Sequence, residues 1–259
     1  MIAERMRTKR FGRAVSYFHR IDSTNTFALK VAGERDALHG RLIVAGGQSG
    51  GRGRHGRRWW NEPEKDILCS LILCPPEPRA MWHLLTLSCG ASICEALRDS
   101  YGLPAGMRWP NDVLIDGRKL CGVLTESGED RLVIGFGVNC NGDPEKLPED
   151  ARAATSLRAE LGRSVQRWSL LSRILECFER RYALFCTHDT EGLRKQHLSL
   201  LGTLGRRVRV WTSGKHPIEG MAIDLEESGR LVVLCDHGPQ VSLSSGEVTE
   251  LKLEEKTKS

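Results

Sequence analysis

One amphipathic segment, set between runs of β-forming residues, constrains the fold more than any other feature. Between Trp82 and Leu97 the apolar side chains recur at intervals of three and four residues, which is the spacing of a helix with one buried face. Short β-rich runs at 41–47 and 66–73 precede this segment and are bounded by glycines and prolines. We therefore expect a helix that packs against a sheet.

Three more β-rich runs follow the helix, at 112–117, 119–128 and 131–139. The turn signals between them predict a meander of paired strands. A second helix is expected near 167–185, where apolar and aromatic residues form one stripe, and a short helix at 22–33. This part of the chain is therefore expected to be of the α+β class, with a mixed sheet and flanking helices.

The character of the sequence changes after Leu201 and Gly202. Four short β-rich runs lie close together between positions 206 and 245, a pattern typical of a small all-β barrel. We therefore expect two domains, one over residues 1–202 and a small β domain over residues 203–259.

Composition narrows the choice of function. The net charge is only +5, from 38 lysines and arginines against 33 aspartates and glutamates, so a general affinity for polyanions is not indicated. The nine cysteines form no C-x-x-C pair and have no histidine at zinc-finger spacing; we expect reduced, mostly buried thiols and no metal site built from protein side chains. The basic N-terminus lacks a following apolar h-region and the hydrophobic stretches look too short to span a bilayer, which favours a cytoplasmic protein without membrane contact.

The stretch GGQSGGRGRHGRRWW, residues 46–60, joins two expected strands and concentrates positive charge on a flexible backbone. Its central part, residues 50–58, contains four glycines and four arginines: Gly50, Gly51, Gly53, Gly56, Arg52, Arg54, Arg57 and Arg58. The glycines would let backbone N–H groups converge on an anion, and the arginines can bind carboxylate or phosphate. It is neither a Walker A loop nor a dinucleotide-binding loop. Taken alone, it fits a solvated basic loop, a nucleic-acid contact with bases stacked on Trp59 and Trp60, or a mobile lid over a phosphate.

A second constellation is RWPNDVLIDGRKLCGVLTES, residues 108–127. Asn111 and Asp112 lie on a proline turn, Lys119 follows an Asp-Gly hairpin, and Gly122 falls inside a strand. A strand glycine often marks the close approach of a ligand, and a lysine beside it can bridge two anions. An aspartate nearby can orient Mg²⁺ or an attacking amine. Taken alone, these residues are equally well explained as turns and an exposed lysine.

Four motifs in this order resemble those of the biotin protein ligases, in particular the bacterial biotin–acetyl-CoA-carboxylase ligases. They are DSTN at 22–25, GGQSGGRGRHGRRW at 46–59, RWPNDVLIDGRKLCGVLTE at 108–126 and GFGVN at 135–139. The likeness covers nearly the whole chain. It implies a class II synthetase-like catalytic domain over 1–202 and an SH3-like β-barrel over 203–259.

The resemblance implies a two-step reaction. Biotin's carboxylate attacks the α-phosphate of ATP, with Mg²⁺, to give biotinyl-5'-adenylate and pyrophosphate. A lysine of a biotin carboxyl carrier protein then attacks the mixed anhydride and releases AMP. Arginines, a lysine and Mg²⁺ would bring the two anions together, and a closing loop would keep water from the fragile intermediate.

The same resemblance assigns roles by position. The expected catalytic residues are Lys119, Arg54 and Asp112. The expected biotin-binding residues are Ser23, Thr24, Asn25, Gln48, Arg52, Gly53, Arg54, Lys119 and Gly122. The expected nucleotide-binding residues are Arg52, Arg54, Trp59, Asn111, Lys119 and Asn139. The loop is expected to order when biotin or its adenylate binds.

Three features depart from the family pattern: two residues and the place where the first motif begins. Arg108 stands where a lysine is usual, and His55 where an arginine is common. The first family motif begins at Ile21, so we expect no N-terminal helix-turn-helix and no DNA binding. The resemblance allows a homodimer through the sheet edge.

Two other functions compete with this interpretation. A lipoate or octanoate ligase or transferase shares the general fold and acts on similar carrier lysines, but the arginine-rich loop favours biotin. A nucleic-acid-binding protein would use the basic loop, but charge elsewhere is nearly balanced and no known binding module is recognisable.

Overall fold

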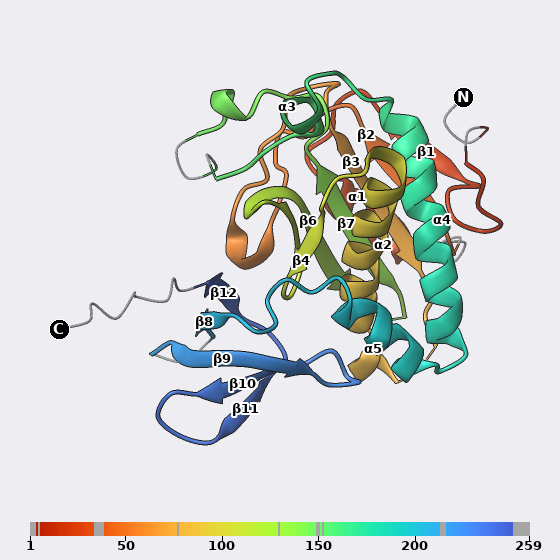
Figure 1. Cartoon of the computed structure of the whole chain (residues 1–259). Helices are drawn as coiled ribbons and strands as arrows, with labels where there is room; N and C mark the ends of the chain where they lie inside the picture. The colour runs from red at the N-terminus through yellow and green to blue at the C-terminus, as the bar shows by residue number, and fades with distance from the viewer. Residues whose placement is uncertain are drawn as a thin grey trace.

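A computed structural model of the chain describes residues 4, 6–33, 39–76, 78–128, 130–148, 151, 153–212 and 216–250. A seven-stranded sheet with helices on both faces forms the larger part, and a five-stranded antiparallel sheet lies beside it (Figure 1). The expected α+β class is confirmed.

The seven-stranded sheet has the order β1-β2-β3-β7-β6-β5-β4. Its strands are β1 (Val15–Phe18), β2 (Leu42–Ala45), β3 (Ile67–Leu73), β4 (Gly106–Arg108), β5 (Asp112–Ile115), β6 (Arg118–Ser127) and β7 (Leu132–Val138). Only β1 and β2 are parallel; the other neighbours are antiparallel, so the sheet is mixed. The expected meander after the first long helix is confirmed, and β4 extends it to four strands.

Helices cover both faces of this sheet. Helix α1 (Thr24–Ala32) packs on one face, against β3 and β7, whereas α2 (Leu84–Tyr101) packs on the other, between the sheet and α4 (Arg167–Cys186) (Figure 1). All three were expected. The short α3 (Leu157–Leu161) and α5 (Thr190–Leu198) were not, because neither carries an extended apolar stripe.

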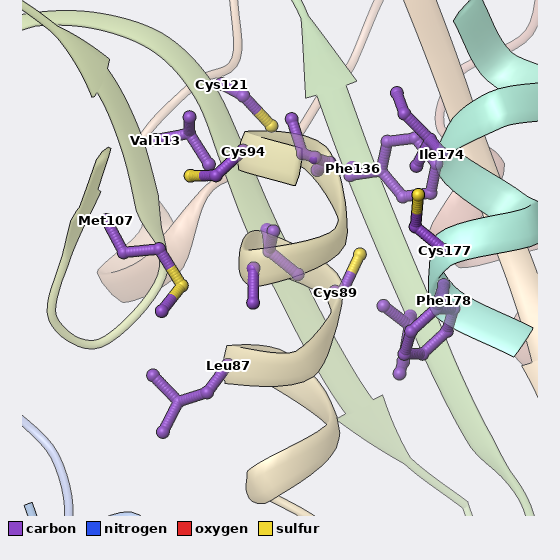
Figure 2. Close-up of a cluster of buried hydrophobic side chains, with 14 of the residues drawn as sticks. Leu87, Cys89, Cys94, Met107, Val113, Cys121, Phe136, Ile174, Cys177 and Phe178 are labelled. Carbon is purple, nitrogen blue, oxygen red and sulfur yellow. The ribbon is translucent and has the colours of Figure 1, made fainter. Parts of the chain in front are cut away.

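The main core surrounds α2. Figure 2 shows Cys89 and Cys94 of this helix among side chains of the sheet, including Phe136, and of α4, including Phe178. All nine cysteines are free thiols and six of them are buried, as expected. Burial raises the pKa of Cys94 to about 12, so this thiol stays protonated and acts as a small apolar residue.

One stretch of the described chain, Arg79–Tyr101, is long and apolar enough to cross a bilayer. The expectation that every apolar stretch is too short to span a bilayer is therefore wrong for this stretch, judged by its length and composition. Inside the protein, however, 72% of its apolar window is buried. The stretch contains α2, which therefore owes its hydrophobicity to its place in the core.

The second sheet has the order β11-β10-β9-β8-β12. Its strands are β8 (Arg207–Trp211), β9 (Ile218–Leu225), β10 (Leu231–Cys235), β11 (Gln240–Leu243) and β12 (Glu247–Glu250). Buried Trp109 joins it to the larger part: its indole N–H donates to the Gly229 carbonyl at 3.1 Å, and its backbone N–H to the Thr203 hydroxyl at 3.0 Å. Residues 213–215 and 251–259 of the expected C-terminal domain lie outside the described residues.

Candidate active site

A cavity of about 600 Å³ lies between the arginine loop, the seven-stranded sheet and the turn before β12. Every residue that the sequence analysis assigned to the site lines this cavity: Ser23, Thr24, Asn25, Gln48, Arg52, Gly53, Arg54, Trp59, Asn111, Asp112, Lys119, Gly122 and Asn139. Segments more than 100 positions apart therefore meet at one place.

One end of the cavity is built from neutral amides and hydroxyls at the N-terminus of α1. The backbone N–H of Thr24 donates to Gln48 Oε1 at 2.6 Å, and the Ser70 hydroxyl lies 2.6 Å from Asn25 Oδ1. Asn25 is only 4% exposed, and a methyl group at Gly135 on β7 would overlap its side chain. These side chains are held in place before any ligand binds.

Glu126 on β6 supports this end by contacting two residues of the cavity lining, and the sequence analysis missed it. Its Oε2 accepts hydrogen bonds from Asn25 Nδ2 at 2.9 Å and from Arg52 Nη2 at 2.8 Å. The alternation of a strand could have found it, because Gly122, Leu124 and Glu126 fall on one face of β6. The sequence analysis also missed Ser70.

Three charged side chains meet at the other end. Lys119 Nζ lies 2.7 Å from Asp112 Oδ1, and Arg108 Nη2 lies 2.7 Å from Asp112 Oδ2. One carboxylate thus aligns two cations at the cavity wall. Arg108 provides one of these two cations, because it pairs with Asp112 across strands β4 and β5.

A β-bulge turns Lys119 toward the cavity. Val113 pairs with Cys121, but the next residue, Leu114, pairs with Lys119, so one extra residue is inserted in β6. Without that insertion Lys119 and Gly122 would point to opposite faces, since side chains alternate along a strand. With it, both line the cavity.

Trp59 forms an aromatic wall over two strand glycines. A methyl group at Gly122 would lie 2.9 Å from its ring and one at Gly137 would overlap it. The ring centroid lies 5.5 Å from Lys119 Nζ. Gly122 thus leaves room for the Trp59 side chain, and the expected approach of a ligand at Gly122 stays a prediction.

The arginine loop between β2 and β3 lies across the cavity, where its short 3-10 turn covers Arg54–Gly56. The N–H of Gly50 donates to the Asp22 carbonyl at 2.8 Å and that of Gly53 to the Arg57 carbonyl at 2.7 Å. In this structure these two N–H groups therefore fix the shape of the loop, and the convergence of N–H groups on an anion stays a prediction.

The C-terminal sheet reaches this loop. Arg54 Nη1 donates to Asn111 Oδ1 at 3.2 Å and to the Gly246 carbonyl at 3.0 Å, while Arg57 Nη2 donates to Glu247 Oε1 at 2.6 Å. Burial lowers the pKa of Arg54 from its ordinary value. The ordinary pKa of arginine lies so far above neutral pH that the guanidinium keeps its charge. The loop is thus held from two sides, and the contribution of the last strand was not foreseen.

Asn139 follows β7 at the remaining wall. Its Nδ2 donates to the Thr155 carbonyl at 3.0 Å and its backbone N–H to the Leu120 carbonyl at 3.0 Å. Within the described part of the chain, no three His, Cys, Asp or Glu side chains come together as metal ligands. A divalent ion here would need ligands from a bound phosphate chain.

Comparisons with known proteins agree with this geometry. Models of two protein families match the chain: the Biotin/lipoate A/B protein ligase family over residues 17–143 and the Biotin protein ligase C terminal domain over residues 203–249. The second match coincides with the part that forms the five-stranded sheet.

Individual relatives extend over most of the chain. It is 31% identical over 239 residues to the bifunctional ligase/repressor BirA of Bacillus subtilis, covering 90% of this chain and 73% of that protein. It is 33% identical over 234 residues to a biotin–acetyl-CoA-carboxylase ligase of Mycobacterium tuberculosis, covering 89% of this chain and 86% of that one. A solved biotin protein ligase from Aquifex aeolicus, in complex with biotin and ATP, is 28% identical, covers 93% of this chain and 100% of its own, and superposes with a TM-score of 0.80. The chain belongs to the biotin protein ligase family.

Proposed function

We propose that this protein activates biotin with ATP as biotinyl-5'-AMP and transfers the biotinyl group to a lysine of a biotin carrier protein. The observation that carries the proposal is the single cavity with a neutral, hydrogen-bonding end and a cationic end. Such a cavity suits a ligand with an uncharged polar ring at one end and a carboxylate at the other.

The neutral end would bind the ureido ring. Ser23, Thr24, Asn25 and Gln48 offer hydroxyl and amide groups, which are both donors and acceptors, as a ureido group requires. Burial of Asn25 favours discrimination, since its side chain is already bonded to Leu124, Glu126 and Ser70 and cannot turn to suit a ligand with a different pattern of polar groups.

The cationic end would bring two anions together. Lys119 would lie between the carboxylate of biotin and the α-phosphate of ATP, with Arg52 and Arg54 closing from the loop and Gly53 allowing the close approach of its backbone. A carboxylate oxygen then forms a bond to the α-phosphorus while the bond to the β-phosphate oxygen breaks, and pyrophosphate leaves. Asp112 would hold Lys119 in line through their 2.7 Å ion pair.

The nucleotide would occupy the wall formed by the aromatic ring and two amides. Trp59 would border the adenylate, with Asn111 and Asn139 on either side, all from the cavity lining. Mg²⁺ would enter with the phosphates of ATP and lower their charge, with Asp112 as a carboxylate at the cationic end of the cavity lining.

In the second step, an acceptor lysine, as free amine, attacks the acyl carbon of the mixed anhydride. The bond from that carbon to the phosphate oxygen breaks, AMP leaves and the new amide loses a proton. The loop would exclude water during this step, because hydrolysis of the anhydride competes with transfer.

The setting of the protein follows from the same chemistry. Nine free thiols suit the reducing cytoplasm, where the carrier protein and ATP are also found. We propose that no DNA or membrane takes part and that β1, at one edge of the sheet, offers a surface for a homodimer.

The decisive experiment is exchange of radiolabelled pyrophosphate into ATP by the purified protein. We expect exchange that needs biotin, ATP and Mg²⁺ together. Exchange that runs equally well with lipoate or octanoate would contradict the assignment to biotin. Binding of DNA or RNA without any exchange would favour the nucleic-acid alternative.

A further inference from the structure

Glu126 is the one acidic side chain that touches both the neutral end of the cavity and the arginine loop in the described structure. We propose that Glu126 is a positioning residue: it couples occupation of the ring-binding end to closure of the loop. The inference rests on the proposed function, because it takes the ring-binding end to be that for biotin.

The coupling depends on one oxygen atom. Glu126 Oε2 accepts from Asn25 Nδ2 at 2.9 Å and from Arg52 Nη2 at 2.8 Å. One carboxylate oxygen therefore helps to position both the Asn25 amide and the Arg52 guanidinium. Both bonds involve a charged acceptor, which makes them stronger than neutral hydrogen bonds. A shift of either donor moves this oxygen and so weakens its hydrogen bond to the other donor.

The two partners differ in how firmly the fold holds them. Asn25 is almost fully buried, its Nδ2 also donates to the Leu124 carbonyl at 3.1 Å, and its Oδ1 accepts from the Ser70 hydroxyl at 2.6 Å. The Arg52 side chain is 43% exposed, and it belongs to a loop whose backbone carries several glycines. Glu126 therefore connects the rigidly held Asn25 to the more exposed Arg52 and limits the movement of the Arg52 side chain.

The direction of the effect follows. A carboxylate can only accept, so it holds Asn25 Nδ2 toward the strand and leaves Oδ1 on the side of Ser70. A ring N–H that donates to Oδ1 would stiffen this arrangement, and the position of Arg52 would stiffen with it. The loop then closes when the ring-binding end is filled, and less readily when ATP alone is present.

Glu126→Gln tests this proposal by pyrophosphate exchange. It removes the charge with little change of size, and we expect KM for biotin to rise about five- to tenfold and KM for ATP to rise less than that. Asp99→Asn is the matched control, since Asp99 makes a similar 2.7 Å ion pair with Arg173 on the helices, outside the cavity lining. It should change neither constant.

A double-mutant cycle separates coupling from a general loss of structure. If Glu126 acts through Arg52, then Glu126→Gln should add little to KM for biotin in an Arg52→Gln background. Full multiplication of the two effects would overturn the proposal. Glu126→Asp, which keeps the charge but shortens the reach, provides the same test if the glutamine variant folds poorly.

Tryptic cleavage in the loop gives a readout without catalysis, because the loop carries arginines at 52, 54, 57 and 58. In the unmodified protein, biotin should slow this cleavage more than ATP does; in Glu126→Gln, protection by biotin should need about five- to tenfold more biotin. Equal protection in the two proteins would overturn the proposal. No biotin-dependent exchange by the unmodified protein would instead overturn the proposed function.

Discussion

The indole of Trp59 rests on Gly137, at a place where no other residue could stand without displacing it. The ring comes from the arginine loop and the glycine from β7, so this contact sets the height of the loop above the sheet. We expect Gly137→Ala to lift Trp59 and to raise KM for ATP about tenfold or more, as loss of an aromatic contact does.

Exchange kinetics with varied ATP check this expectation. Gly33→Ala is a suitable control, because Gly33 has φ of −76° and an added methyl group would meet only the Lys30 carbonyl, at 3.6 Å. An unchanged KM for ATP in Gly137→Ala would exclude the aromatic wall from nucleotide binding.

Lys119→Met should lower the rate of adenylation at least about a hundredfold, because it removes the charge proposed to bridge the two anions. The fold should survive, since the lysine side chain is 34% exposed and such an ion pair contributes little to stability. Lys119→Arg should recover only part of the rate, as a guanidinium differs in shape from an ammonium. Single-turnover formation of the adenylate measures all three proteins; normal turnover by the methionine variant would remove Lys119 from its role.

Arg54 and Arg57 should differ sharply when each is replaced by alanine. Arg54 is partly buried and donates to Asn111 and to the Gly246 carbonyl, so its loss should reduce kcat/KM for ATP more than about tenfold. The Arg57 side chain is 64% exposed and pairs with Glu247, so its loss should cost less than about threefold and should matter less at high salt. Similar losses in both variants would contradict this ranking.

His197 should make stability depend on pH. It is fully buried on α5, its Nε2 lies 3.1 Å from the Ser88 hydroxyl, and burial lowers its pKa to about 3. In the unfolded chain the His197 imidazole binds a proton near pH 6.5, whereas in the folded chain it does so only near pH 3. The stability that neutral His197 contributes is therefore fully present above pH 6.5 and falls as the pH drops below that value.

For this one group, the free energy of unfolding should fall by about 1.4 kcal/mol per pH unit, or about 2 kcal/mol at pH 5. Denaturant unfolding between pH 7.5 and pH 4 measures the slope, and His197→Gln should flatten it by close to one proton. Burial also lowers the pKa of His39, so the difference between the two proteins, and not the absolute slope, is the test. Parallel curves would show that His197 does not titrate on unfolding.

The sequence predicted most of the helices and strands, because local patterns of apolar residues and turns specify them. Leu84, Leu87 and Cys94 recur at a helical period, and the runs that became β3 and β7 are apolar segments, broken only by Ser70 in β3 and bounded by turns. Strand β1 has only four residues, and α5 buries only Leu193 and His197, so neither leaves a pattern strong enough to predict. The residues of the ordered motifs line one cavity, because the order and spacing of these motifs are those of a family with this fold.

What the sequence could not predict depends on register and on distant contacts. The cavity-facing position of Lys119 results from a bulge, and nothing in the local pattern distinguishes a bulged strand from a regular one. The bonds from Asn25 and Arg52 to Glu126 join residues 74 or more positions apart. Such pairs appear only once the strands are aligned.

The hydrogen bond from Arg54 to the Gly246 carbonyl also orders events during synthesis. The two residues are 192 positions apart, and Gly246, Glu247 and Val248 form one wall of the cavity. Because the chain is made from its N-terminus onward, the loop and Asn111 emerge long before the second acceptor of Arg54. A nascent chain that ends before residue 246 therefore lacks one wall of the cavity and one of the two acceptors of Arg54, and the complete site forms only after the last strand has been made.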